Sequence, residues 1–213
     1  MNHLKFSFFN IFSVISIILV LVLILVPFNV INLEQAQRIA KWLKVYEEMN
    51  YSFSLVKMYE GTIIPDKNEA DKIITEEYIV ERIAPYLNIE NDAKIQTKIE
   101  DYSYRLLNRK NLKKNNQFSF NKFLKTKDGM LLSVKENQKE NLIDITPLYF
   151  MFVDINGEEK PNQIGKDIFI INIYKDNIKP LGTGRGHASL KVNCSPIGTG
   201  LYCAEYYLLG GSF

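Results

Sequence analysis

The chain has 213 residues, of which 46% are hydrophobic and 23% are charged, and its formal net charge is +2. This composition is that of a folded globular chain and excludes a largely disordered one. The small net charge excludes a general electrostatic attraction to polyanions. The length allows one N-terminal helix and one further domain of about 150 to 180 residues.

The first element is an uncharged stretch, residues 6–27, with the sequence FSFFNIFSVISIILVLVLILVP. A helix of about 20 apolar residues is long enough to cross the hydrocarbon core of a bilayer. The stretch therefore predicts a leader and membrane-spanning helix over residues 1–32. The alternative is a cleaved secretory signal, but the sequence after Val26 lacks the pair of small residues that a cleavage site needs.

The next element is an amphipathic helix over residues 33–60. Apolar residues recur there every three or four positions and form one stripe, which is expected to pack on a sheet of the same chain. Gly61, followed by Pro65, predicts that this helix ends at about residue 60. The stripe consists of Leu33, Ala36, Ile39, Leu43, Tyr46, Met49, Phe53 and Val56.

Two segments of opposite charge occupy the variable region 61–122 and its border. A second helix with an acidic surface is predicted over residues 68–87. The stretch 102–127 then contains eight basic residues and no acidic one, with aromatic residues between them. We interpret it as a solvated surface segment. The alternative is polyanion binding, in which basic side chains follow a phosphate backbone and aromatic rings stack on bases; no specific nucleic acid is expected.

Strand patterns dominate residues 123–213. Asp128-Gly129 predicts the turn of a hairpin, because glycine adopts the positive φ that such a turn requires. The segment PLYFMFVDIN predicts a central strand, DIFIINIY its antiparallel neighbour, and YCAEYYLL a last strand. The predicted class is α+β: a long N-terminal membrane-spanning helix continues into the amphipathic helix, and this packs on a C-terminal antiparallel sheet in a head of residues 33–213.

One segment, VDINGEEKPNQIGKDIF, carries four candidate calcium ligands: Asp154, Asn156, Glu158 and Asp167. The same residue types also build Asx turns around glycine and proline. The segment departs from the EF-hand template, because Glu159 stands where the obligatory glycine belongs. We therefore predict a structural turn and no cofactor, with calcium as the alternative.

The two cysteines, Cys194 and Cys203, flank a loop rich in glycine and proline, and we predict a disulfide between them. A hydrolase triad of His187, Ser189 and Asp176 can be drawn from the sequence, but the serine lies in no nucleophile elbow. Walker and dinucleotide-binding motifs are absent from the sequence. We expect neither catalysis nor a small-molecule substrate.

The N-terminal register resembles that of type IV pilins and type II secretion pseudopilins. Phe6 follows the basic leader, an apolar run begins after Asn10, and Pro27 falls at the family's spacing. Lys5 replaces the glycine at the family's cleavage site, and Asn10 replaces the glutamate that pairs with the next subunit. At the other end of the chain, D-x-N-G followed by P-N, Gly and D-x-F resembles the C-terminal heads of prepilin-like secretion proteins.

The resemblance implies a structural assembly subunit, similar to a pseudopilin or minor pilin. Its implied partners are other pilin-like subunits, contacted through the N-terminal helix, and the inner membrane. Its implied location is the inner (cytoplasmic) membrane, crossed once, with the head outside the cytoplasm. The alternative is a membrane-tethered binding module, for a polyanion or calcium, that does not join a filament.

Overall fold

The computed structural model describes residues 8–65, 75–89, 98–113, 116–137 and 146–212. The chain forms two compact units, Met1–Arg38 and Ile39–Phe213, where the sequence predicted a boundary after residue 32. One helix, α1 (Phe8–Glu60), supplies residues to both units.

The first unit corrects the membrane prediction. Among the residues that the structure describes, no helix has the length and hydropathy needed to cross a membrane. The membrane-spanning part of the predicted fold class, the single-pass keywords and the inner-membrane location are therefore wrong.

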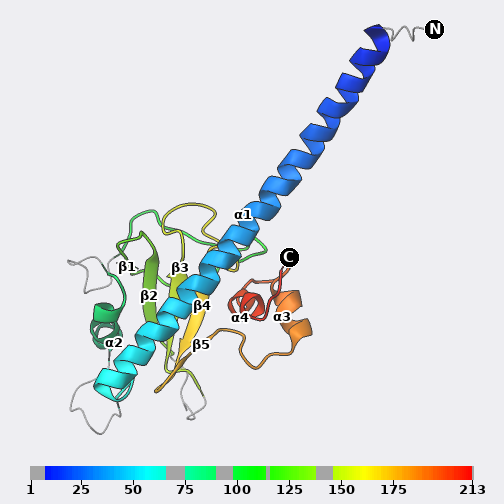
Figure 1. Ribbon diagram of the computed structural model, residues 1–213. Helices are drawn as coiled ribbons and strands as arrows, with labels where there is room; N and C mark the ends of the chain where they lie inside the picture. Colours follow the sequence, from blue (N-terminus) through cyan, green and yellow to red (C-terminus); the bar gives the residue numbers. More distant parts are fainter. Residues whose placement is uncertain (1–7, 66–74, 90–97, 114–115, 138–145, 213) are drawn as a thin grey trace. The chain divides into compact units, whose positions relative to one another are not determined.

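The second unit is built on a five-stranded antiparallel sheet in the order β1-β2-β3-β4-β5 (Figure 1). The predicted hairpin is confirmed, because β1 and β2 pair across a turn in which Gly129 has a φ of 86°. The predicted central strand and its antiparallel neighbour are also confirmed, as β3 and β4. The strands are β1 (Leu124–Lys125), β2 (Leu131–Glu136), β3 (Tyr149–Asp154), β4 (Ile168–Ile173) and β5 (Ile178–Pro180).

One face of the sheet packs against α1. Trp42 is fully buried there, its ring stacks on that of Phe169 at 4.3 Å between centroids, and its Nε1 donates a hydrogen bond to the carbonyl of Ala204 at 3.0 Å. The predicted stripe is confirmed at Met49, Phe53 and Val56, which are buried, but Trp42 is buried in place of its predicted neighbour Leu43, which is exposed. Adjacent helix positions lie about 100° apart, and the larger aromatic surface faces the sheet.

The opposite face is covered by an irregular segment, residues 98–113 and 116–123. Its Phe118, Phe120 and Phe123 are buried with Phe150 and Phe152 of β3. All six residues of β3 are buried, as are all six of β4, because both faces of the sheet are covered. Burial on both faces explains why the sequences of these two strands are continuous apolar runs and do not alternate between apolar and polar residues.

Short helices complete the second unit. α2 (Glu76–Ile83) begins after Thr75, whose side chain accepts the N–H of Tyr78, and the 3-10 helix η1 (Ala84–Tyr86) follows it. The start of the predicted helix over residues 68–87 lies outside the described residues. α3 (His187–Asn193) and α4 (Cys203–Leu208) lie near the C-terminus (Figure 1).

The predicted last strand, YCAEYYLL, is wrong, because this segment forms α4. Its aromatic residues favour strands locally. In the helix, however, Cys203, Ala204 and Tyr207 bury one face in the core of the second unit. Tertiary packing therefore outweighs the local preference.

Candidate functional site

The connection between β3 and β4, residues 154–167, holds the predicted calcium ligands. Asp154 ends β3 and Asp167 immediately precedes β4, and both are fully buried. Oδ1 of Asp154 accepts the backbone N–H of Asn156 at 3.2 Å and that of Gly157 at 3.0 Å. Buried backbone donors need such partners, so Asp154 shapes the start of this turn.

Asp167 performs the same role at the other end of the connection. Its Oδ2 accepts the N–H of Asn162 at 2.8 Å, and its Oδ1 accepts the N–H of Gln163 at 2.7 Å. Asn162 has a positive φ of 47°, a conformation in which asparagine is enriched. The two carboxylates thus hold a turn whose backbone is sharply bent.

Tyr102 is the partner of this turn that sequence reasoning missed. Its hydroxyl donates to Oδ2 of Asp154 at 2.5 Å, although the two residues are 52 positions apart. Burial raises the pKa of Asp154 to about 7; the hydrogen bond from Tyr102 lowers this pKa and the nearby Asp167 raises it. Burial, followed by the charge of Asp154, raises the pKa of the Tyr102 hydroxyl.

The predicted calcium ligands are only partly brought together. Asn156 donates through Nδ2 to the carbonyls of Glu159 and Lys160, at 3.0 and 3.3 Å. Glu158 is instead paired with Lys125 at 3.6 Å, with both side chains about half exposed. The carboxylates of Asp154 and Asp167 accept protein donors, as described above.

A metal centre is not evident in the part of the chain that the structure describes. There, no group of three or more His, Cys, Asp or Glu side chains is arranged to hold a metal ion. Oδ1 of Asn156 is buried and has no hydrogen-bond partner. One amide oxygen falls short of the six to eight oxygen ligands that calcium takes. The carboxylate oxygens at this turn serve its hydrogen bonds instead.

The irregular segment over the sheet is tied to this turn at several points. The backbone N–H of Arg105 donates to the carbonyl of Asn162 at 3.1 Å. The side-chain amide of Gln163 donates to the carbonyls of Leu106 and Leu107, at 3.0 and 2.7 Å. Phe118, Phe120 and Phe123, three of the aromatic residues in the predicted polyanion-binding stretch 102–127, are buried in the core, so they do not form an exposed stacking surface.

The C-terminal end is cross-linked by a disulfide. Cys194 follows α3 and Cys203 begins α4, with an S–S distance of 2.06 Å, as the sequence predicted for this pair. Gly200 lies between them with a φ of 81°, and a Cβ there would stand 2.3 Å from the carbonyl oxygen of Ile164. The loop therefore requires glycine at this position.

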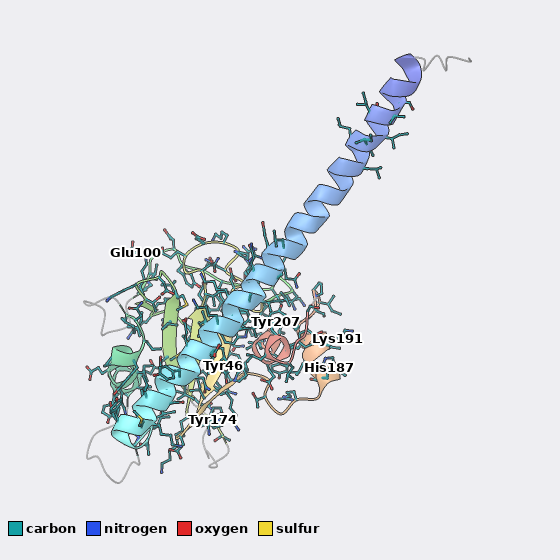
Figure 2. All side chains as sticks on the ribbon, in the orientation of Figure 1. Tyr46, Glu100, Tyr174, His187, Lys191 and Tyr207 are labelled. Carbon is teal, nitrogen blue, oxygen red and sulfur yellow. A yellow bond between two sulfur atoms is a disulfide. The ribbon has the colours of Figure 1, made fainter. Side chains whose placement is uncertain are left out.

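The three residues of the hydrolase alternative, His187, Ser189 and Asp176, are not joined into a catalytic triad by hydrogen bonds in the described part of the chain. His187 and Ser189 are exposed on α3, and Asp176 is exposed in the turn before β5. His187 has a ring contact with Tyr206, at 5.6 Å between centroids, and is labelled in Figure 2. Across the described ranges, no hydrogen bond links these three residues.

The predicted assembly residues lie in the first unit. Phe6 falls outside the described residues, whereas Asn10 and Pro27 lie where the backbone of α1 is helical. Seven large apolar side chains between positions 14 and 21 are each 50–58% exposed. They follow one another almost without interruption, so they occupy every side of the helix.

Comparisons of the chain with protein-family models, with curated proteins and with solved structures each find no match.

Proposed function

We propose that the chain is an assembly subunit, similar to a pseudopilin or minor pilin of a type II secretion or type IV pilus system. In this function the first unit packs against the N-terminal helices of other subunits. The observation that supports the proposal is the run of exposed apolar side chains on α1, residues 14–21.

The two parts of α1 differ in what covers them. From Trp42 to Val56, one side of the helix is buried in the core of the second unit. Between positions 14 and 21 the apolar side chains remain about half exposed on all sides. A helix that is apolar all round requires a cover on all sides. Several neighbouring helices of like composition provide such a cover.

The free energy that burial of these side chains would contribute to an assembly is substantial. Complete burial of an exposed Val, Leu or Ile side chain contributes about 1.5 to 3 kcal/mol. Because each of the seven side chains is about half exposed, each has about 1 kcal/mol left to gain in an assembly. Ser16 is also exposed, and a small side chain allows close approach between helices.

A charged residue within the run tests the proposal. In Leu19→Lys, an ammonium group would be buried without a partner at the helix contact, which costs at least about 2 kcal/mol per contact. We expect the purified full chain to lose its association with other copies or with other chains that carry an N-terminal apolar helix. The measurement is the molar mass by light scattering, with the chains identified by mass spectrometry.

Met58→Lys is the matched control, because Met58 is 66% exposed on the same helix but belongs to the second unit. It should leave the assembly unchanged. Retention of the same partners by Leu19→Lys, at the same molar mass, would contradict the proposal.

A further inference from the structure

A cavity of about 150 Å³ lies in the second unit between α1, the segment after α2, and the β1–β2 hairpin. We propose that it binds an alkylammonium group, carried either by a free amine or by a lysine side chain of a polypeptide. This site is independent of the proposed assembly function, which uses the first unit.

The inner lining of the cavity is apolar. These residues come from α1, from the segment after η1 and from β2 and its turn, and all are buried: Val45, Met49, Leu87, Met130 and Leu132. Two buried hydroxyl groups also line it, but both already donate within the protein. Ser52 bonds to the carbonyls of Glu48 and Tyr86, and Thr126 bonds to Asp128. The interior therefore suits a chain of methylene groups.

The exposed part of the lining is acidic. It contains the carboxylates of Glu48 and Asp128, together with Asn88 and the half-buried Tyr86, and no basic side chain lines the cavity. Oδ1 of Asp128 accepts the Thr126 hydroxyl at 2.5 Å. Among the described residues, Asp128 forms no ion pair.

Lys44 competes weakly for Glu48. Their ion pair has a distance of 3.6 Å, and their side chains are 77% and 58% exposed. Exposed pairs of this kind contribute little. An incoming ammonium group can therefore replace Lys44 at Glu48.

An alkylammonium group fits this distribution of polar and apolar surface. Such a group buries its methylene stem on apolar atoms and keeps its charged head near water. Here the stem would lie against Met49 and Met130, and the head would lie between Glu48 and Asp128. A neutral alcohol or amide would leave Asp128 without a cation and Glu48 with only its exposed partner Lys44.

Methionine methyl resonances can report binding directly. The full chain contains five methionines, of which Met49 and Met130 line the cavity, and Met151 is buried elsewhere in the core. With ¹³C-methyl methionine, we expect saturable shifts of the Met49 and Met130 signals on titration with n-butylammonium. Met151 should not shift. N-acetyl-lysine N′-methylamide tests access for a lysine side chain, and the norleucine analogue is its uncharged control.

Two substitutions test the carboxylates. Asp128→Asn and Glu48→Gln should each weaken n-butylammonium binding about three- to fivefold, and the double variant about tenfold or more, as for partly exposed ion pairs. Glu47→Gln, exposed on the same helix and outside the lining, should have no effect. The hairpin tolerates Asn at position 128, because asparagine is a favoured turn residue.

The outcomes separate the two sources of the ligand. Binding of both ammonium compounds would identify a site open to polypeptide lysine, and binding of n-butylammonium alone would identify a site for a free amine. The inference is overturned by the absence of saturable shifts with either compound. Equal shifts with the norleucine analogue, or unchanged affinity in the double variant, would also overturn it.

Discussion

Replacing Asp154 by Asn tests whether the turn between β3 and β4 contains a carboxyl group that is costly to ionise. Asp154 is fully buried, and burial raises its pKa from 3.8 to about 7. Asn keeps a side-chain oxygen that can accept the N–H groups of Asn156 and Gly157, but it carries no charge. The variant therefore removes the titration and preserves those acceptor contacts.

The sign and size of the effect follow from the pKa of Asp154. Because this pKa is higher in the folded chain than in the unfolded chain, the bound proton stabilises the folded state. This contribution is complete below about pH 4 and is lost as the pH rises to about 7. The interval between 3.8 and about 7 corresponds to about 4 kcal/mol.

Urea unfolding at pH values from 4 to 8 measures the prediction. Trp42 is the single tryptophan and is fully buried on Phe169, so its fluorescence reports unfolding of the second unit. Between pH 4 and pH 8, the unfolding free energy of Asp154→Asn should rise by about 4 kcal/mol relative to the unmodified chain. Asp176→Asn, which alters an exposed carboxylate, should follow the unmodified profile. Parallel profiles for Asp154→Asn and the unmodified chain would refute the reasoning.

Three further predictions concern contacts of the second unit. Tyr102→Phe removes the hydroxyl that donates to Asp154, and it should reduce the unfolding free energy at pH 8 by about 1 to 3 kcal/mol. Trp42→Ala should cost about 3 to 5 kcal/mol, measured by circular dichroism because the fluorophore is lost. Replacement of Cys194 and Cys203 by serine opens a loop with a sequence separation of 9 and should lower the unfolding free energy by about 2 to 3 kcal/mol.

Each of these predictions has an outcome that would contradict it. An unfolding free energy for Tyr102→Phe equal to that of the unmodified chain would mean that the hydroxyl makes no net contribution. Leu43→Ala is the control for Trp42→Ala, because Leu43 is partly exposed on the same helix. Equal losses of unfolding free energy in the two variants would show that the burial of Trp42 does not account for its effect. For the disulfide, the same midpoint in urea with and without the two serines would contradict the loop-closure reasoning.

The sheet could be predicted because its signals are local. Asp128-Gly129 marks a tight turn, and the apolar runs in β3 and β4 indicate strands covered on both faces. The pattern of α1 predicted a helix and the burial of Met49, Phe53 and Val56. It was wrong at Leu43, since periodicity alone does not choose between the adjacent Trp42 and Leu43. The apolar N-terminal run likewise indicated a helix, and its interpretation as a membrane span was wrong.

The sequence by itself determined the elements whose chemistry is contained within a few residues, such as the hairpin turn, the central strands and the long helix. The tertiary structure decided which other segments those elements contact. The contact of Tyr102 with Asp154, the helix formed by Cys203–Leu208, and the cavity beside Met49 and Met130 depend on residues far apart in the chain. Such contacts form only when the packed core brings the segments together, and they leave no periodic signal in any one segment.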